Sequence, residues 1–257
     1  MNGIPLPDIA GEQLVAFVLV LARLGGIFAL APPFSTRLIP ARAKTILALA
    51  LALALTPLAE RGQHIPQDVT ALAPILLKEI VVGLAFALAL GALAAAVQAG
   101  ASVIDTMIGF SFSNLVDPMS GTNTSVFGEL YSLFATMVFL LVGGDRVLVL
   151  GLAKSYDLLP LAAMPSLHAL AVLATDNLAQ ITLVGIEIAA PVVAALVVTD
   201  AAFALVARAV PQMNVMFVGL PAKVMAGLAV SMASLPFVAQ FYGANIETNL
   251  IRALQAL

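Results

Sequence analysis

Several charged side chains lie within or beside long apolar runs of the sequence: Arg23, Lys78, Glu79, Glu187, Asp200, Arg208 and Lys223. A charge at the centre of a membrane-spanning helix costs about 2.5–3.5 kcal/mol on insertion scales, so it normally faces a protein interior, a partner or water. One interpretation makes Glu187 or Asp200 a proton or ion site of a secondary transporter. We favour anchoring between helices or subunits, because the acids are scattered and no inverted repeat is visible.

One pair of these charges could interact within the chain. Asp200 and Arg208 are eight residues apart. In a continuous helix, this spacing brings them close to one face. The sequence therefore allows an ion pair between them.

The sequence shows no catalytic pattern. It contains no cysteine, which excludes disulfides and thiolate chemistry, and His64 and His168 are too isolated for an obvious metal site. The stretch from Gly109 to Ser113 fails the nucleophile pattern G-x-S-x-G at its last position, and no zinc-protease or nucleotide-binding motif occurs. We therefore expect a non-enzymatic protein without metal or cofactor.

The composition indicates the environment of these residues. Of 257 residues, 62% are hydrophobic and 10% are charged, and the mean hydropathy is +1.09. Soluble domains carry roughly 45–50% apolar and about 25% charged residues, so a soluble globule and a disordered chain are both excluded. The net charge of −3 argues against a nucleic-acid partner. The sequence predicts an all-α polytopic membrane protein, with residues 1–257 forming one integral unit.

Six apolar segments approach or exceed the length that spans a bilayer, about 20 residues. They cover residues Leu14–Ala31, Lys44–Ala59, Ala73–Ala99, Leu130–Leu150, Leu178–Ala207 and Val215–Gln240. The last two contain Pro191, Pro221 and Pro236, so we expect packed helical hairpins with helices broken at prolines. The pair Gly143-Gly144 predicts a tight turn.

One helix carries a stripe of small residues. Gly83, Ala87, Gly91, Ala95 and Ala99 recur at every fourth position. Such a stripe lets a second helix approach closely. We expect packing within the chain, and packing against another subunit is the alternative.

The segment 100–128 combines glycine and turn residues with bulky apolar side chains. Its notable residues are Gly109, Phe110, Phe112, Asp117, Pro118, Met119 and Gly121. Glycine permits unusual backbone conformations, and methionine adapts its shape to its surroundings. This mixture suits a plug that seals a passage and can also move. The alternative is a connecting loop that buries its phenylalanines in the core.

A longer motif resembles a known family. The stretch from Arg208 to Lys223 reads R-A-V-P-Q-M-N-V-M-F-V-G-L-P-A-K. It is similar to the pattern R-x-x-P-Q-[apolar]-N-x-[apolar]-x-x-G-x-P-x-K of the FliR family, membrane components of the flagellar type III export gate. Weaker similarities lie at 33–44, 109–121 and 155–160. Asp145 departs from the family, in which many members carry histidine at this position.

The resemblance implies a partner-covered channel subunit. FliR proteins assemble with FliP and FliQ into a helical ring in the bacterial inner membrane, within the flagellar basal body, with FlhB and FlhA nearby. By resemblance, segment 109–121 is a plug that gates unfolded flagellar proteins. The equivalent subunit of a virulence injectisome is an alternative.

We interpret the charged and motif residues as structural or as partner contacts: Arg208, Pro211, Gln212, Asn214, Gly219, Pro221, Lys223, Glu187 and Asp200. The prolines would fix the entry and exit of a hairpin. Asn214 would bond exposed backbone at the break. Arg208 and Lys223 would bond helix ends or acidic groups of a partner.

Overall fold

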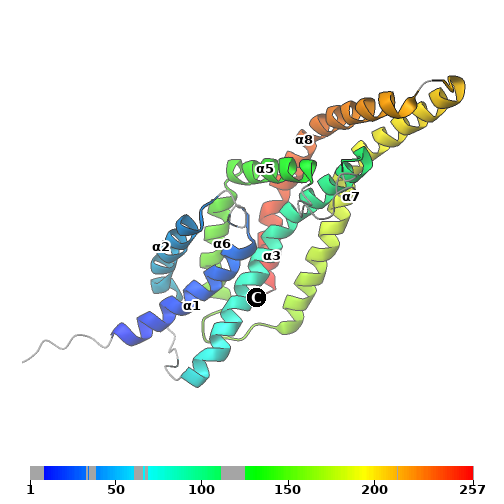
Figure 1. The fold of residues 1–257 in the computed structure, drawn as a ribbon. Coiled ribbons are helices and arrows are strands. Elements are labelled where there is room, and N and C mark those ends of the chain that lie inside the picture. Colours follow the sequence, from blue (N-terminus) through cyan, green and yellow to red (C-terminus); the bar gives the residue numbers. More distant parts are fainter. Residues whose placement is uncertain are drawn as a thin grey trace, which may run out of the picture. The chain divides into compact units, whose positions relative to one another are not determined.

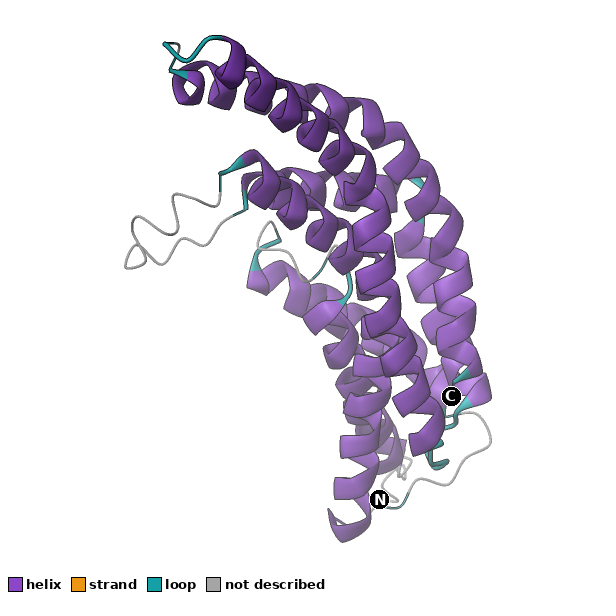
Figure 2. Ribbon diagram, turned by 90° about the vertical axis from the view of Figure 1, so that its right-hand side faces the viewer, coloured by secondary structure: helices purple, strands orange, loops and turns teal. Residues whose placement is uncertain are grey.

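The computed structural model describes residues 9–32, 34, 39–60, 66, 69–110, 125–212 and 214–256. All the regular structure within these ranges is helical (Figure 2), which confirms the all-α prediction. The helices are α1 (Ile9–Leu30), α2 (Ala41–Ala59), α3 (Val69–Ile108), α5 (Val126–Leu141), α6 (Gly144–Leu158), α7 (Leu167–Ala209) and α8 (Val215–Gln255).

The lengths and compositions of these helices confirm a polytopic membrane protein. Among the described residues, α1, α2, α3, α7 and α8 are each long and apolar enough to cross a bilayer. The pair α5 and α6, with a short break between them, makes a sixth candidate span. The break contains Gly143, whose φ of 75° is a left-handed conformation that glycine adopts without strain. The predicted Gly143-Gly144 turn is confirmed, and it divides the expected segment Leu130–Leu150.

The prolines of the last two helices do not end them. Pro191 lies inside α7, which has 43 residues, and Pro221 and Pro236 lie inside α8, which has 41. The expectation of breaks at these prolines was wrong. A proline removes one backbone hydrogen bond, and neighbouring helices can compensate for that loss in a membrane protein.

The chain forms two compact units. Unit 1 comprises Met1–Gly91, Gly143–Asn177 and Ile246–Leu257, and unit 2 comprises Ala92–Val142 and Leu178–Asn245. Each unit combines segments that are far apart in the sequence. The expectation of one integral unit over 1–257 stays a prediction.

In unit 1, glycines bring α1 and α3 into backbone contact. A Cβ atom on Gly26 would lie 2.6 Å from the backbone nitrogen of Leu84, and one on Gly83 would overlap the carbonyl oxygen of Arg23. Further along, a Cβ atom on Gly91 would lie 3.0 Å from the carbonyl oxygen of Leu30. The two helices therefore run parallel, and the small-residue stripe packs within the chain as expected.

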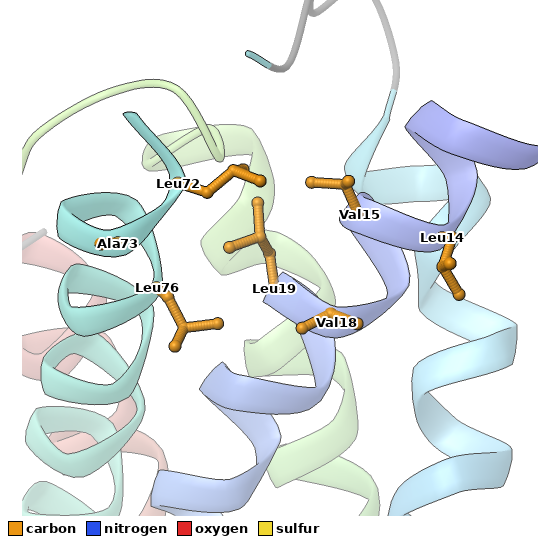
Figure 3. Close-up of a pocket in the computed structure, with 7 residues that line it drawn as sticks. All are labelled: Leu14, Val15, Val18, Leu19, Leu72, Ala73 and Leu76. Carbon is orange, nitrogen blue, oxygen red and sulfur yellow. The ribbon is translucent and has the colours of Figure 1, made fainter. Parts of the chain in front are cut away.

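Towards their first turns, α1 and α3 leave an apolar groove between them (Figure 3). Its volume is about 370 Å³, and it is lined by Leu14, Val15, Val18, Leu19, Leu72, Ala73 and Leu76. Leucine side chains occupy α3 here, where glycine lies further along. The groove therefore forms where the small-residue stripe has not yet begun.

Unit 2 is built on an antiparallel hairpin of α7 and α8, whose arms lie side by side in Figure 1. Gly219 faces the ring of Phe203, and Gly227 lies close to Leu196. On another side of α7, a Cβ atom on Gly100 of α3 would lie 2.7 Å from the carbonyl oxygen of Gly185. Small residues thus bring α3 and α8 close to α7.

Candidate functional site

The connection between α3 and α5 is anchored at both ends by Asp105. The buried carboxylate accepts hydrogen bonds from the hydroxyl of Ser125 and from the backbone N–H of Phe127, the latter at 3.1 Å. Its backbone carbonyl accepts the N–H groups of Gly109 and Phe110, both at 3.1 Å. One residue therefore fixes the end of α3 and the start of α5.

Local sequence explains this arrangement. Gly109 has a φ of 104°, a conformation suited to glycine after the last turn of a helix. Ser125 is the N-cap of α5, and its hydroxyl oxygen accepts the N–H of Gly128 at 2.7 Å. The hydroxyl proton remains free to bond Asp105. The hydroxyl group of Ser125 can thus cap α5 and bond Asp105 at the same time.

Aromatic rings extend the anchor. The rings of Phe110 and Phe127 stack with centroids 6.1 Å apart, and Phe127 and Tyr131 follow at 6.4 Å. The hydroxyl group of Tyr131 lies 3.3 Å from that of Ser234 on α8. The loop base is therefore connected to the hairpin of unit 2.

The structure narrows the predicted plug segment. Residues 100–108 belong to α3 and residues 126–128 to α5, because helical structure continues beyond the expected boundaries. Gly109 and Phe110 lie at the described base of the loop, and Phe110 is partly exposed. The other predicted plug residues fall outside the described residues: Phe112, Asp117, Pro118, Met119 and Gly121.

The motif between α7 and α8 lies at the turn of the hairpin. Arg208, Pro211, Gln212 and Asn214 are exposed. The backbone carbonyl of Asn214 accepts the N–H of Phe217 at 3.1 Å. Asn214 thus bonds the first turn of α8 through its main chain, whereas we expected a bond from its side chain.

Further into the hairpin, Lys223 donates a hydrogen bond to Asp200 at 2.7 Å. This ion pair takes the place of the one that the sequence allowed, because the described residues show no ion pair between Asp200 and Arg208. Gly219 faces Phe203. Pro221 lies within α8 and does not mark the exit of the hairpin.

Glu187 lies one turn before Pro191 and borders a groove between α7 and α8. The groove has a volume of about 390 Å³ and is lined by Glu187, Pro191, Val230, Ala233, Ser234 and Phe237. Glu187 is exposed. The described part of the chain contains no group of three or more histidine or acidic side chains that could hold a metal ion.

Unit 1 contains a buried charge cluster that joins α1, α3 and α6. The guanidinium of Arg23 meets the carboxylate of Glu79 through two hydrogen bonds, of 2.5 and 3.0 Å. It also donates to the hydroxyl of Ser155 at 2.9 Å and to the carbonyl of Leu159 at 3.1 Å, and it lies 4.2 Å from the ring centre of Tyr156. The guanidinium is thus paired and solvated by protein atoms.

Lys78 completes this cluster. Its ammonium lies 2.6 Å from a carboxylate oxygen of Glu79. It also donates to the carbonyl oxygens of Leu161, Ala163 and Pro160, at 2.8, 3.1 and 3.3 Å. These bonds hold the connection between α6 and α7 against α3. From the sequence we expected these charges to face a protein interior, a partner or water, and the structure places them in the interior of unit 1.

The comparison with known proteins agrees with these features. Residues 14–248 match the family described as "Bacterial export proteins, family 1". Over 212 residues, the chain is 31% identical to the flagellar biosynthetic protein FliR of Bacillus subtilis, covering 81% of this chain and 82% of that protein. It is 28% identical over 222 residues to the FliR protein of Escherichia coli, covering 86% and 84%.

A protein with a different name is also similar to this chain. The surface presentation of antigens protein SpaR of Salmonella typhimurium is 30% identical over 218 residues, covering 84% of this chain and 80% of that protein. The family match contains the whole loop between α3 and α5, the α7–α8 motif and all three members of the buried charge cluster. The family match covers most of this helical membrane protein. The chain therefore belongs to the bacterial export proteins, family 1.

Proposed function

We propose that this chain is a non-enzymatic subunit of a flagellar type III export gate. The observation that carries the proposal is the family match over residues 14–248, together with 31% identity to a flagellar biosynthetic protein. In this proposal, the chain completes a helical channel with FliP and FliQ homologues. FlhB and FlhA homologues are further partners in the inner membrane and basal body, and unfolded flagellar proteins pass through.

The loop between α3 and α5 is the proposed gate. The Asp105 anchor holds both ends of the loop at one place in unit 2. A loop held in this way can change its path without unfolding the helices beside it. Phe112 and Met119 supply bulky apolar groups, which suit a constriction that blocks ions by excluding water.

The exposed apolar surface supports a partner-covered subunit. Large apolar side chains are exposed along most helices, for example Leu141, Leu205 and Phe217, which are 79%, 70% and 80% exposed. Lipid or neighbouring subunits must cover a surface of this kind. Charged residues on the same helices, such as Glu187 and Asp200, favour subunits over lipid alone.

The second candidate is the equivalent subunit of a virulence injectisome. The 30% identity to SpaR favours it, because this value is close to that for the flagellar relatives. Complementation separates the two systems. Restored swimming in a strain that lacks its own flagellar subunit supports the flagellar assignment, and restored effector secretion alone supports the injectisome.

The experiment that tests the function is co-purification. Tagged chain is extracted from its native membrane in mild detergent, and the recovered proteins are identified by mass spectrometry. Recovery of FliP and FliQ homologues in one large complex is the expected result. A stable monomer or homodimer without them would contradict the proposal and favour a transporter that uses Glu187 or Asp200.

A further inference from the structure

The groove between α7 and α8 in unit 2 has the chemistry of a site for a basic side chain. Most of its wall is apolar, formed by Pro191, Val230, Ala233 and Phe237. Glu187 adds a carboxylate. Lysine and arginine combine an apolar stem with a cationic head, so they match a surface that is apolar along its length and anionic at one point.

The other polar groups beside the groove are acceptors. Pro191 has no backbone N–H, so it cannot donate the usual helical hydrogen bond to the carbonyl of Glu187. The hydroxyl of Ser234 donates to the carbonyl of Ser231 at 2.8 Å. Its oxygen also contacts the hydroxyl of Tyr131 at 3.3 Å, which uses one acceptor lone pair, and the second lone pair remains for a group in the groove. This arrangement selects a donor that carries positive charge.

The charge of Glu187 has no counterpart in the part of unit 2 that the structure describes. The ion pairs of the described residues use Glu79 and Asp200, and none includes Glu187. Its neighbours Leu183 and Ile186 are 63% and 59% exposed, so the surface around it is apolar. A lone carboxylate in such surroundings is unfavourable unless a cation joins it.

We propose that this groove, here called the Glu187 groove, binds a lysine or arginine side chain carried by an apolar helix of another export-gate subunit. The partner helix covers Phe237 and Val230, and its cation pairs with Glu187. The inference rests on the proposed function, because it assumes a complex with other membrane subunits. Charge complementarity selects the occupant: an uncharged helix or a lipid acyl chain leaves Glu187 unpaired.

The chain is well suited to a crosslinking test, because it has no natural cysteine. Ala233→Cys places one thiol at the groove, where a photoactivatable maleimide is attached in native membranes. Met232→Cys is the control, since Met232 is 66% exposed but does not line the groove. We expect Ala233→Cys to crosslink to another subunit, at a site within one helical turn of a lysine or arginine.

The dependence on charge decides the result. Adding Glu187→Gln should lower the Ala233→Cys crosslink about tenfold or more, because removing one member of a buried pair weakens association strongly. The Met232→Cys crosslink should persist. Glu187→Lys should also lose the Ala233→Cys crosslink. Replacing the partner's basic residue with glutamate in that variant exchanges the two charges and should restore the crosslink.

Other outcomes overturn the proposal. These are a crosslink to a second copy of this chain, to an exported protein or to no protein, and an unchanged yield with Glu187→Gln. Co-purification with FliP and FliQ homologues is measured on the same samples. If that complex is present and the groove crosslink is absent, the groove inference alone fails. If the complex is absent, the proposed function fails as well.

Discussion

Ser125 donates a hydrogen bond from its hydroxyl group to the carboxylate of Asp105, 20 positions earlier in the chain. Asp105 lies in the last turn of α3, and Ser125 caps α5. The bond therefore closes the loop between these helices at its base. A second bond, from the backbone N–H of Phe127 to Asp105, makes the closure depend on one carboxylate.

Asp105→Ala should open the base of the loop. The change leaves the N–H of Phe127 and the hydroxyl of Ser125 without their acceptor, and an unsatisfied buried group costs about 1–3 kcal/mol. If the loop gates the channel, the assembled complex should leak ions, which membrane conductance measures. Ser102→Ala is the control, because Ser102 is exposed and its hydroxyl donates to the carbonyl of Ala99 in the same helix, away from the loop base. Equal conductance for wild type and Asp105→Ala, with assembly verified, would contradict the role of this anchor.

Deleting residues 113–122 should remove the proposed seal while the complex still assembles. The deleted segment contains Asp117, Pro118 and Met119. The residues that close the base of the loop, Asp105 and Ser125, lie outside it and remain. Conductance should rise, because the apolar barrier is lost. A glycine–serine segment of equal length serves as the control for loop length and should also leak. Tight membranes in both variants would refute the plug assignment.

Glu79→Gln should strongly destabilise unit 1. The change removes the carboxylate that compensates two buried cations, Arg23 and Lys78, and breaking a buried pair costs about 3–5 kcal/mol. Thermal unfolding in detergent, followed by circular dichroism, gives the measurement, since the chain has no tryptophan. Glu12→Gln, at an exposed site in the first turn of α1, should shift stability by at most about 0.5 kcal/mol. A similar loss of thermal stability in both variants would show that the buried charge cluster contributes little to the stability of unit 1.

Two glycine substitutions should have opposite effects. Gly83→Ala places a methyl group into the backbone of Arg23 and should cost about 1–3 kcal/mol. Gly25→Ala, in the partner helix, meets no atom within 4 Å and should stabilise α1 by about 0.5–1 kcal/mol. The same unfolding measurement compares them. A stability of Gly83→Ala equal to that of wild type would rule out the close contact between α1 and α3.

Features that depend on a short stretch of sequence, within one helix or at one turn, were predicted well. The stripe containing Gly83 and Gly91 indicated close packing, and Gly143-Gly144 indicated the turn between α5 and α6. The prolines misled us, because Pro191 and Pro236 lie in helices that continue past them. A local rule for helix breaking does not include the compensation that neighbouring helices provide.

Pairings between distant residues could not be predicted. Arg23 and Glu79 are 56 positions apart, and no pattern in either segment identifies the other residue as its partner. The Asp105 anchor was missed for the same reason, although a serine before the apolar run of α5 is an N-cap signal. Asp200 had a plausible partner on its own helix, but the hairpin brought Lys223 closer. Tertiary contacts decided each of these cases.

Unit 1 is built from three separate chain segments, and this has a consequence for biosynthesis. Lys78 and Arg23 leave the ribosome well before residues 159–163, whose carbonyl groups they bond, and residues 246–257 of the same unit follow much later. In that last segment, Leu250 packs onto Gly151. A nascent chain that ends before α8 therefore presents an incomplete unit 1 to the insertion machinery. Truncated chains should be substrates for membrane quality-control proteases, even when α1, α2 and α3 have already been inserted.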